Sequence, residues 1–554
     1  MPPQARCLSR GSHPLNRRAF LQRSVVGSAA LALSACRSLS MDPGGWRNKL
    51  GTTYVLPRWQ YRPTSADDLV NLVSKAEREG RRIRMTGSGH SFSDVAINAD
   101  WLLSPSGLTQ VLPLDVSSLR VDAKPETLVR VQSGCTIRNL NLALEDRGLA
   151  LQNMGGADVQ TFVGAASTGT HGSGLAFGPL ASQIEAIQLV GAGGEMLQLE
   201  PRDGISEANK FSGRLIEQPH IKVSLRHDDK LFNAVAVSLG SMGVIYAVIL
   251  RAAHKFWLVE RRTLTTWEEL AKADGVVDRL MTSRPIRRAV PDQNPLPAGD
   301  CVPGPGVEPD HIEIYYTPYP EADGSHLALL TERWRVDCKP PGVGEPRGSP
   351  LFTLGEDLSV LADQLGLLVP TAGKNIDDVR HFHQLALGQL KQKYFANVSY
   401  KVFSIGILNE IHAYGIELAF DLKDIKAAVA GNFHLAAELA SDHIFHTTPV
   451  SLRFVDASSA TLAMQAGRRT LMMEIGVLVG LAGAEELLRR YEEVFVSSLG
   501  ARPHWGLDRN HLRGEGAVAR LYPGWNDWKS ALNDLNPHGT FDGSITDRLG
   551  ISHG

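Results

Sequence analysis

The chain has 554 residues, of which 43% are hydrophobic and 21% charged, a globular composition too long for one simple core, so we expect at least two domains. A formal net charge of −2 and an isoelectric point near 6.8 give no basic field, and nucleic acid is therefore not an expected partner. Beyond the N-terminus no apolar run reaches the roughly eighteen residues of a membrane span, so the mature protein is not expected to cross a membrane.

Residues 1–36 are expected to be an export signal. An Arg-Arg pair is followed by Phe20, Leu21 and a short apolar stretch, as in twin-arginine signals, by which the Tat machinery exports proteins that are already folded. The letters LSAC also resemble a lipobox, in which cleavage leaves Cys36 as an acylated N-terminus; the alternative is an ordinary signal with an incidental cysteine. We expect an exported, periplasmic protein that is anchored to the membrane as a lipoprotein.

The next segment, about 50–253, is expected to form one α+β or α/β domain. Thr64 and Ser65 precede two acids and a series of apolar residues at helical spacing, which predicts a capped amphipathic helix, and the letters RRIRMTG predict a strand after it. Farther on, LVRVQSG, IEAIQLVG and SMGVIYAVILRA are typical of strands, and TIRNLNLALEDRG is typical of a helix that ends at Gly148. Alternating elements of this kind indicate a mixed sheet-and-helix domain.

Residues 254–499 are expected to hold a second set of strands and helices. The part from Pro285 to Pro350 is rich in proline and glycine and predicts long loops around the strand IEIYYTPY, and VSLRFVDAS and GAEELLRRYEEVFVSSL predict a later strand and helix. Cys301 and Cys338 lie in similar loops, where a disulfide and two free thiols are both consistent with the sequence. Residues 500–554 are aromatic and predict loops with one short helix.

Two loops rich in small residues suggest a bound diphosphate. In GSGHS, which begins at Gly87, the glycines permit positive φ and a close approach to the backbone. The stretch GGADVQTFVGAASTGTHGSG, from Gly155 to Gly174, offers further backbone amides that could cradle phosphates. Neither loop is a Walker loop or a GxGxxG that opens a helix, which disfavours a nicotinamide Rossmann domain.

These two loops resemble the PCMH-type flavin-binding domain of the vanillyl-alcohol-oxidase superfamily. The tail, RPHWG followed by LYPGWNDWKSALNDLNPHGTF, is similar to the aldonolactone and alditol oxidases, a group that includes L-gulonolactone and D-arabinono-1,4-lactone oxidases. The resemblance implies an α+β fold: a two-subdomain FAD-binding domain over 50–253, a substrate or cap domain over 254–499 built on an antiparallel sheet with flanking helices, and a C-terminal segment, 500–554, that returns to the FAD site. It covers 55–200 well and 255–440 poorly.

The resemblance implies that FAD is bound covalently through His90. A neutral imidazole is a good nucleophile near neutral pH, and a covalent bond would retain the cofactor outside the cell. Gly155 matches a position where dehydrogenase relatives have an alanine that hinders oxygen, so glycine favours an oxidase. For His171 a structural role within its own loop is equally open. The other expected FAD contacts are Gly87, Ser88, Gly89, Ser91, Gly155, Gly156, Thr161, Gly164, Thr168, Gly169, Thr170, His171 and Val244.

Hydride removal beside a hydroxyl group needs an acid or base next to a cation. Many of these oxidases have Glu-x-Arg on the strand where this chain has Ser451 and Arg453, so the arginine is kept and the glutamate is absent. Glu417 and Glu474 are candidates for the missing acid, and His504 matches the histidine of the family's tail; a structural or surface position is the alternative for each strand residue.

Leu507 stands where the family often has a lysine that balances charge on reduced flavin, so Arg509 or Arg453 would have to supply the cation. The sequence as a whole predicts an FAD-dependent oxidase that oxidises a sugar lactone or polyol, with O2 as acceptor and H2O2 as product, and no metal site. The alternatives are a dehydrogenase of the same fold that uses a periplasmic electron carrier, and a non-catalytic flavin- or ligand-binding lipoprotein.

Overall fold

The computed structural model describes residues 45–49, 51–282, 296–345, 375–404, 413–478, 482–507 and 511–553. The expected export signal with Cys36, and the candidate cation Arg509, lie outside these residues. In the described ranges, no helix has the length and apolar character needed to cross a membrane.

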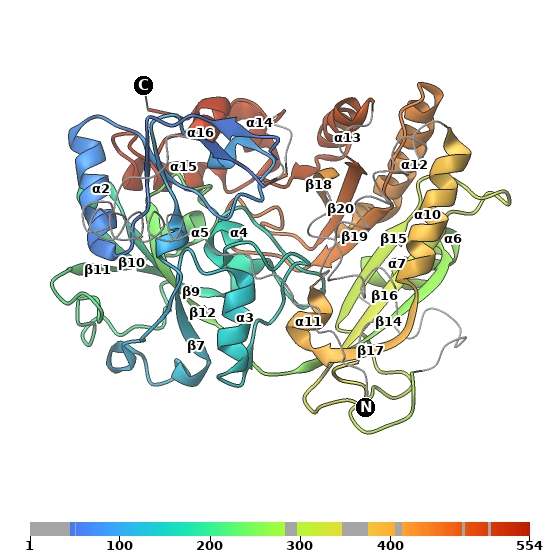
Figure 1. The fold of residues 1–554 in the computed structure, drawn as a ribbon, viewed down its shortest axis with the longest axis horizontal. Helices are drawn as coiled ribbons and strands as arrows, with labels where there is room; N and C mark the ends of the chain where they lie inside the picture. The colour runs from blue at the N-terminus through green and yellow to red at the C-terminus, as the bar shows by residue number, and fades with distance from the viewer. Residues whose placement is uncertain are drawn as a thin grey trace, which may run out of the picture.

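The described chain forms two bodies side by side (Figure 1). The first contains a six-stranded sheet in the order β11-β10-β9-β12-β7-β6 and a three-stranded parallel sheet in the order β3-β5-β4. The strands of the larger sheet are β6 (Val111–Leu112), β7 (Leu128–Gln132), β9 (Ile184–Val190), β10 (Met196–Glu200), β11 (Val223–His227) and β12 (Val244–Arg251). Those of the smaller sheet are β3 (Trp59–Tyr61), β4 (Ile83–Met85) and β5 (Trp101–Leu103), with short pairs β1 (Trp46–Arg47) with β2 (Tyr54–Val55) and β8 (Leu149–Ala150) with β13 (Ala253–His254).

The helices of the first body are α2 (Ala66–Arg78), α3 (Ile137–Glu145), α4 (Phe162–Ala166) and α5 (Asp229–Ala236). The predicted cap of α2 is confirmed, because the Ser65 hydroxyl accepts a hydrogen bond of 3.1 Å from the backbone N–H of Asp68. Its apolar stripe, which includes Leu69 and Val73, is fully buried in one core cluster with strand residues of the sheets. The helix therefore forms where the sequence predicts it.

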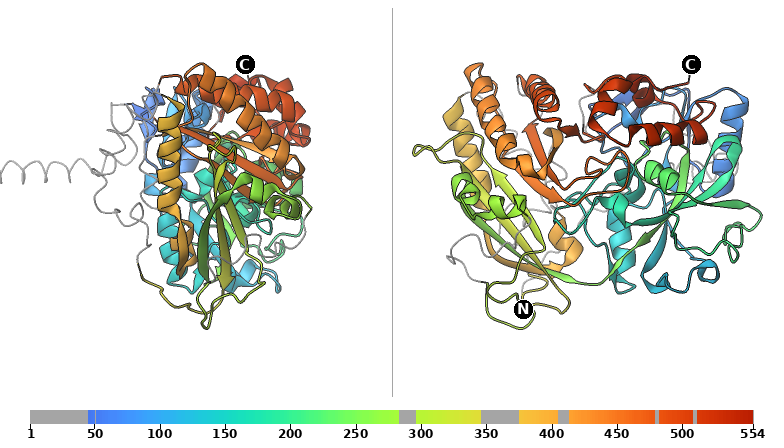
Figure 2. Two further views of the ribbon diagram at one scale, coloured as in Figure 1. Left: turned by 90° about the vertical axis from the view of Figure 1, so that its right-hand side faces the viewer. Right: turned by 180° about the vertical axis from the view of Figure 1, so that it is seen from behind.

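The second body is built on an eight-stranded sheet whose neighbours are all antiparallel, in the order β17-β14-β16-β15-β19-β20-β18-β21. Its strands are β14 (Trp257–Thr266), β15 (His311–Tyr316), β16 (Leu327–Val336), β17 (Gln392–Val398), β18 (Ala413–Asp421), β19 (Val450–Val455), β20 (Thr470–Leu478) and β21 (Arg502–Pro503). The helices beside it are α6 (Trp267–Ala271), α7 (Val276–Met281), α10 (Ile376–Leu390), α11 (Ser399–Phe403), α12 (Ile425–Ser441) and α13 (Ala484–Leu499). The expected antiparallel sheet with flanking helices is confirmed (Figure 2).

The two faces of this sheet differ because successive side chains of a strand point to opposite sides. Leu418 and Leu452 belong to the apolar cluster that α12 and α13 cover. Alternate positions on the same strands carry Glu417, Ser451 and Arg453, which lie on the other face. That polar face meets the first body, as the bond of 3.1 Å between His171 of the first body and Glu417 shows.

The C-terminal segment contains three helices, α14 (Glu515–Leu521), α15 (Trp525–Leu535) and α16 (Ser544–Leu549), so the prediction of one short helix among loops is wrong. Its aromatic residues form the buried faces of these helices: Trp525 and Trp528 are both buried, and the Trp528 indole donates to the Val237 carbonyl at 3.1 Å. The segment, red in Figure 1, therefore lies on the first body although it follows the second in sequence.

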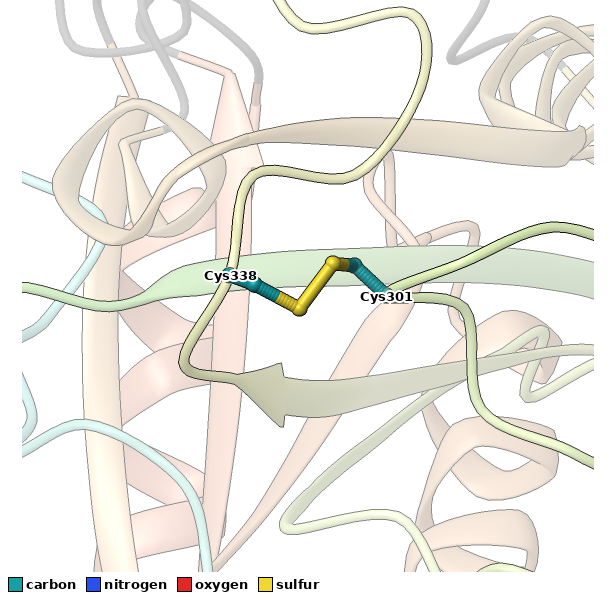
Figure 3. The surroundings of a disulfide bond; sticks show 2 residues. All are labelled: Cys301 and Cys338. Atoms are coloured by element: carbon teal, nitrogen blue, oxygen red, sulfur yellow. A yellow bond between two sulfur atoms is a disulfide. The ribbon is translucent and has the colours of Figure 1, made fainter.

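The region expected to hold long loops also contains a ten-residue strand, β16, which pairs with both β14 and β15. Cys301 and Cys338 flank this part of the sheet and form a disulfide, with their Cα atoms 5.6 Å apart (Figure 3). The alternative of two free thiols is wrong. Cys135 is a buried free thiol.

Candidate functional site

A cleft with an empty volume of about 960 Å³ is lined by both glycine-rich loops and by the C-terminal segment. Ten of the predicted site residues line it: Gly87, Ser88, Gly89, His90, Ser91, Thr161, Gly164, Thr168, Thr170 and His504. Five expected FAD contacts do not: Gly155, Gly156, Gly169, His171 and Val244, although the neighbours of Val244, Gly243 and Ile245, do line the cleft. Two loops far apart in sequence thus share one cavity.

The turn that carries His90 is held from both sides. Gly89 has φ +82°, the left-handed conformation that favours glycine. The first hairpin supports the turn, because the Lys49 backbone N–H donates to the Gly89 carbonyl at 2.8 Å and the Asn48 amide donates to the Ser91 carbonyl at 3.0 Å. On the other side, the Phe92 N–H donates to the Gly506 carbonyl at 2.7 Å. His90 is half-buried and lines the cleft, and these hydrogen bonds fix the turn that carries it.

The chemistry of the cleft wall fits FAD. The hydroxyl oxygens of Ser133 and Thr161 are buried and hydrogen-bond to no described residue, which is costly unless a ligand satisfies them. A side chain at Gly164 would place its Cβ 2.6 Å from the Thr161 hydroxyl, so the wall admits only a glycine there. Hydroxyls and bare backbone match a ligand with phosphate and ribityl oxygens. Ser133 was not predicted; it directly follows β7 in the letters QSG, and only its place beside the second loop reveals it.

Arg453 lies among three carboxylates on the polar face of the large sheet. Its guanidinium lies 2.9 Å from Glu474, 3.4 Å from Glu417 and 3.9 Å from Glu313. Strand pairing sets this arrangement, because Glu313 on β15 pairs with Arg453 on β19, and Glu474 on β20 pairs with both Glu417 on β18 and Ser451 on β19. The structure therefore brings Arg453, Glu417 and Glu474 together, which places the predicted acids beside the predicted cation, and adds Glu313.

The carboxylates differ in their electrostatics. Burial acts to raise the pKa of Glu417, but the hydrogen bond and charge of His171 and the charge of Arg453 outweigh it and lower the pKa to about 2. Burial also acts to raise the pKa of Glu313, but the charges of Arg333 and Arg453 outweigh it and lower the pKa to about 2. Burial and the charge of Glu417 raise the pKa of Glu474, against the opposing effect of Arg453. Glu474 is thus the carboxyl group of the three that takes up a proton most readily.

Ser451 does not replace the absent family glutamate. Its hydroxyl is buried and hydrogen-bonds to no residue in the described ranges. Glu474, directly opposite Ser451 on the neighbouring strand, contacts Arg453 instead. The alternative of an exposed strand glutamate is wrong for Glu417, which is 3% exposed, whereas the Glu474 side chain is 38% exposed.

Two histidines connect this cluster to the cleft. His171 bonds the Gly172 carbonyl through Nδ1 at 2.8 Å and Glu417 through Nε2 at 3.1 Å. His504 lines the cleft, its backbone N–H donates to the Glu417 carbonyl at 2.8 Å, and the two imidazole rings are 6.3 Å apart. The Gly506 N–H donates to Nδ1 of His504 at 3.0 Å, and burial, opposed by Glu417 and assisted by His171 and Arg453, lowers the pKa of His504 to about 4, so this ring is neutral.

Among the described residues no group of three or more histidine, cysteine, aspartate or glutamate side chains is arranged to hold a metal ion. The three carboxylates of the cluster surround the Arg453 guanidinium instead. The arrangement can hold a cation next to one titratable carboxyl group and can accept or donate a proton there.

Comparisons with known proteins agree with this geometry. An FAD-binding domain matches residues 57–200, and a D-arabinono-1,4-lactone oxidase domain matches residues 354–549. The chain is 27% identical over 508 residues to L-gulono-1,4-lactone dehydrogenase of Mycobacterium tuberculosis, covering 91% of this chain and 98% of that protein. It is 24% identical to L-gulonolactone oxidase of Mus musculus over 89% of this chain and 95% of that protein, and 30% identical to D-arabinono-1,4-lactone oxidase of Yarrowia lipolytica over 40% of this chain and 37% of that protein.

Among solved structures, cholesterol oxidase from B. sterolicum shares the fold with a TM-score of 0.66 and 14% identity, covering 92% of this chain and 99% of that chain. The α+β, PCMH-type fold expected from the sequence is thereby confirmed. Residues 57–200 and 354–549 thus match, in chain order, an FAD-binding domain and a D-arabinono-1,4-lactone oxidase domain, and nine-tenths of the chain is similar to an aldonolactone dehydrogenase.

Proposed function

We propose that the protein oxidises a CH–OH group of a sugar lactone or polyol, with FAD held covalently through His90 and O2 as the electron acceptor that yields H2O2. The observation that carries the proposal is the Arg453 cluster with its most readily protonated carboxyl group, Glu474, joined through Glu417 to His504 on the cleft wall. FAD, when bound, supplies the hydride acceptor. The protein must then bind the alcohol and remove its hydroxyl proton.

In this proposal the Glu474 carboxylate accepts the hydroxyl proton of the substrate. Its side chain is 38% exposed, so a substrate can reach it, and its partial burial together with the charge of Glu417 raises its pKa toward the range in which a general base works. Arg453, 2.9 Å from Glu474, stabilises the negative charge that develops on the substrate oxygen. Glu313 on the neighbouring strand β15 and Glu417 on β18, one strand beyond β20, hold the guanidinium in place. Glu474 thus takes the role of the glutamate that the family often has at the position of Ser451.

Covalent attachment is supported by the place of His90 on the cleft wall and by the contacts that hold its turn on both sides. A nucleophilic ring nitrogen needs such a defined orientation, because an imidazole that rotates freely spends little time in position to attack. The residues of the FAD-facing wall named above, from Gly87 to Thr170, would bind the rest of the cofactor.

The test of the proposed function is oxidation in air of a panel of aldonolactones and polyols, with H2O2 and oxidised product measured together. One molecule of H2O2 for each molecule of lactone or polyol oxidised is the expected result. No turnover of any panel member, with or without an artificial acceptor, would contradict the proposal.

A dehydrogenase is the second candidate function. It is favoured because the chain matches 98% of the length of a relative that is named as a dehydrogenase. The glycine at position 155 favours the oxidase, since the resemblance places there the alanine by which dehydrogenase relatives hinder oxygen. Turnover that requires an artificial acceptor and forms no H2O2 would establish the dehydrogenase instead.

We also propose export by a twin-arginine signal and anchoring through an acylated Cys36, on the sequence pattern alone. Fractionation of cells that express the wild-type chain or Cys36→Ser tests this. The wild-type protein is expected in the membrane fraction and the variant in a soluble exported fraction; equal partition of both would contradict the anchor.

A further inference from the structure

The two ring nitrogens of His171 both face hydrogen-bond acceptors. Nδ1 lies 2.8 Å from the Gly172 carbonyl oxygen, which can only accept. Nε2 lies 3.1 Å from the Glu417 carboxyl group, which is 3% exposed and also lies 3.4 Å from the Arg453 guanidinium. A buried carboxyl group beside an arginine is ionised and accepts on both oxygens. Satisfying both bonds therefore requires a hydrogen on each ring nitrogen of His171.

We propose that His171 is held as an imidazolium and is the cation that takes the place of the lysine absent at Leu507. The protonation state follows from the contacts of His171 alone, whereas its consequence for flavin rests on the proposed function. His171 lies behind the cleft wall, next to Thr170, which lines the cleft, and facing His504 with the rings 6.3 Å apart. His171 acts on the cleft through its charge and holds Glu417 in position through their hydrogen bond.

The charges around His171 are consistent with this state. The groups near it are Glu417 on β18, Arg453 on β19, Glu474 on β20 and His504 after β21. With a neutral His171 the cluster would hold one cation against two carboxylates beside the cleft. With an imidazolium, the two positive charges of Arg453 and His171 balance the two carboxylates. When Glu474 takes up the substrate proton, the cluster gains one positive charge at the moment that negative charge passes to the cleft.

The third carboxylate, Glu313, does not disturb this balance, because it has its own cation. Arg333 lies 3.0 Å from Glu313 and bonds Glu260 at 2.7 Å on its other side. His504, by contrast, is neutral beside the charged His171. Its Nδ1 accepts a hydrogen bond from the Gly506 N–H, so its one hydrogen is on Nε2. One histidine of the pair is thus charged and the other is not.

The protonation state can be read directly by nitrogen NMR of protein labelled at histidine. At about pH 8, above the ordinary histidine range, one buried ring with both nitrogens protonated is expected, and its signals should disappear in His171→Gln. Glu417→Gln keeps the ring but removes the anion, so the same signals should become those of a neutral ring at that pH. A His171 ring with a single hydrogen in the wild-type protein would overturn the proposal, whether or not flavin is bound.

The effect on flavin can be read from the binding of sulfite to the flavin-loaded protein, because the adduct leaves negative charge on the flavin. The Kd for sulfite should rise about tenfold in His171→Gln, equivalent to about 1.4 kcal/mol. His220→Gln is the matched control: His220 also pairs with a carboxylate, Asp67 at 2.6 Å, but its side chain is 65% exposed and does not line the cleft. Equal Kd values in the two variants would overturn the role of His171. A wild-type protein that binds no flavin would instead defeat the proposed function and leave the NMR result standing.

Discussion

The residues of the site divide into those that a local motif reveals and those that only strand pairing reveals. His90 and Thr161 lie in two short loops whose small residues together suggest a bound diphosphate, and both line the cleft. Glu313 could not be found this way, because its contact with Arg453 depends on how β15 pairs with β19, more than a hundred residues later. The choice between Glu417 and Glu474 as the acid likewise needed their burial and partners, which the alternating strand pattern does not specify.

Glu474→Gln should lower kcat about a hundredfold or more, the usual cost of losing a general base, with a smaller change in KM. Because Glu474 must be ionised to accept a proton, the wild-type rate should rise with pH through its raised pKa, and the variant should lose this acid limb. Steady-state kinetics across pH measure both effects. Glu486→Gln, on an exposed helix surface, serves as the control. A Glu474→Gln enzyme with wild-type kcat would show that another group is the base.

His90→Ala should lose covalently attached flavin, since no other nucleophile is proposed for the bond. Acid precipitation separates bound from free cofactor: the wild-type pellet should be yellow, and the variant pellet colourless with flavin in the supernatant. If flavin washes out of the acid-treated wild-type protein, the covalent attachment is wrong even where the fold is right.

At the scale of elements, the sequence predicts strands and helices well where one clear period dominates. Helix α2 and strands β7, β9, β12 and β19 form as predicted, since their apolar residues recur at helical spacing or as buried runs. Only one of the three C-terminal helices was predicted, because two of them have six or seven residues and the tryptophans of the segment, buried against the first body, resemble loop aromatics when read alone. Strand β16 was missed because proline and glycine on both sides dominate that region's composition.

Helix α10 buries a histidine that should make the protein sensitive to acid. His383 is fully buried, neither ring nitrogen hydrogen-bonds to a described residue, and burial lowers its pKa to about 3. Between that value and about pH 6.5 the unfolded chain binds the proton and the folded one does not, so stability falls as pH falls. At about pH 5 this one group costs about 2 kcal/mol of unfolding free energy.

His383→Leu should therefore lose less stability than the wild-type protein between about pH 7 and pH 5. Denaturant unfolding at both pH values measures the difference. His381→Leu, an exposed histidine on the same helix, is the control and should follow the wild-type curve. Parallel losses of stability in the wild type and His383→Leu would contradict a neutral buried ring.

At the scale of the whole molecule, the C-terminal segment closes the structure by returning to the first body. The Arg548 guanidinium bonds Asp94 at 2.9 Å across 454 residues of sequence, and both side chains are largely buried. Asp94 follows the His90 turn by four residues, so this contact joins the tail to the cofactor loop. The sequence resemblance implied the return, but its residue contacts depend on the assembled fold.

Arg548→Ala should lower the free energy of unfolding by about 3–5 kcal/mol, because it leaves a buried carboxylate without its cation. Arg82→Ala removes an exposed ion pair to Asp547, in the same helix as Arg548, and should cost at most about 1 kcal/mol. Thermal and denaturant unfolding of the two variants make the comparison. Equal stability would show that the tail is held by its apolar contacts alone.

In the proposed function, this protein transfers hydride from an alcohol group of a small sugar derivative to its flavin. Anaerobic mixing with aldonolactones and polyols, followed by the visible absorption of the flavin, tests it most directly. We predict that at least one lactone or polyol bleaches the flavin completely and that Glu474→Gln slows the bleaching by about a hundredfold or more. A protein that binds flavin but keeps its colour with every lactone and polyol tried would contradict the account.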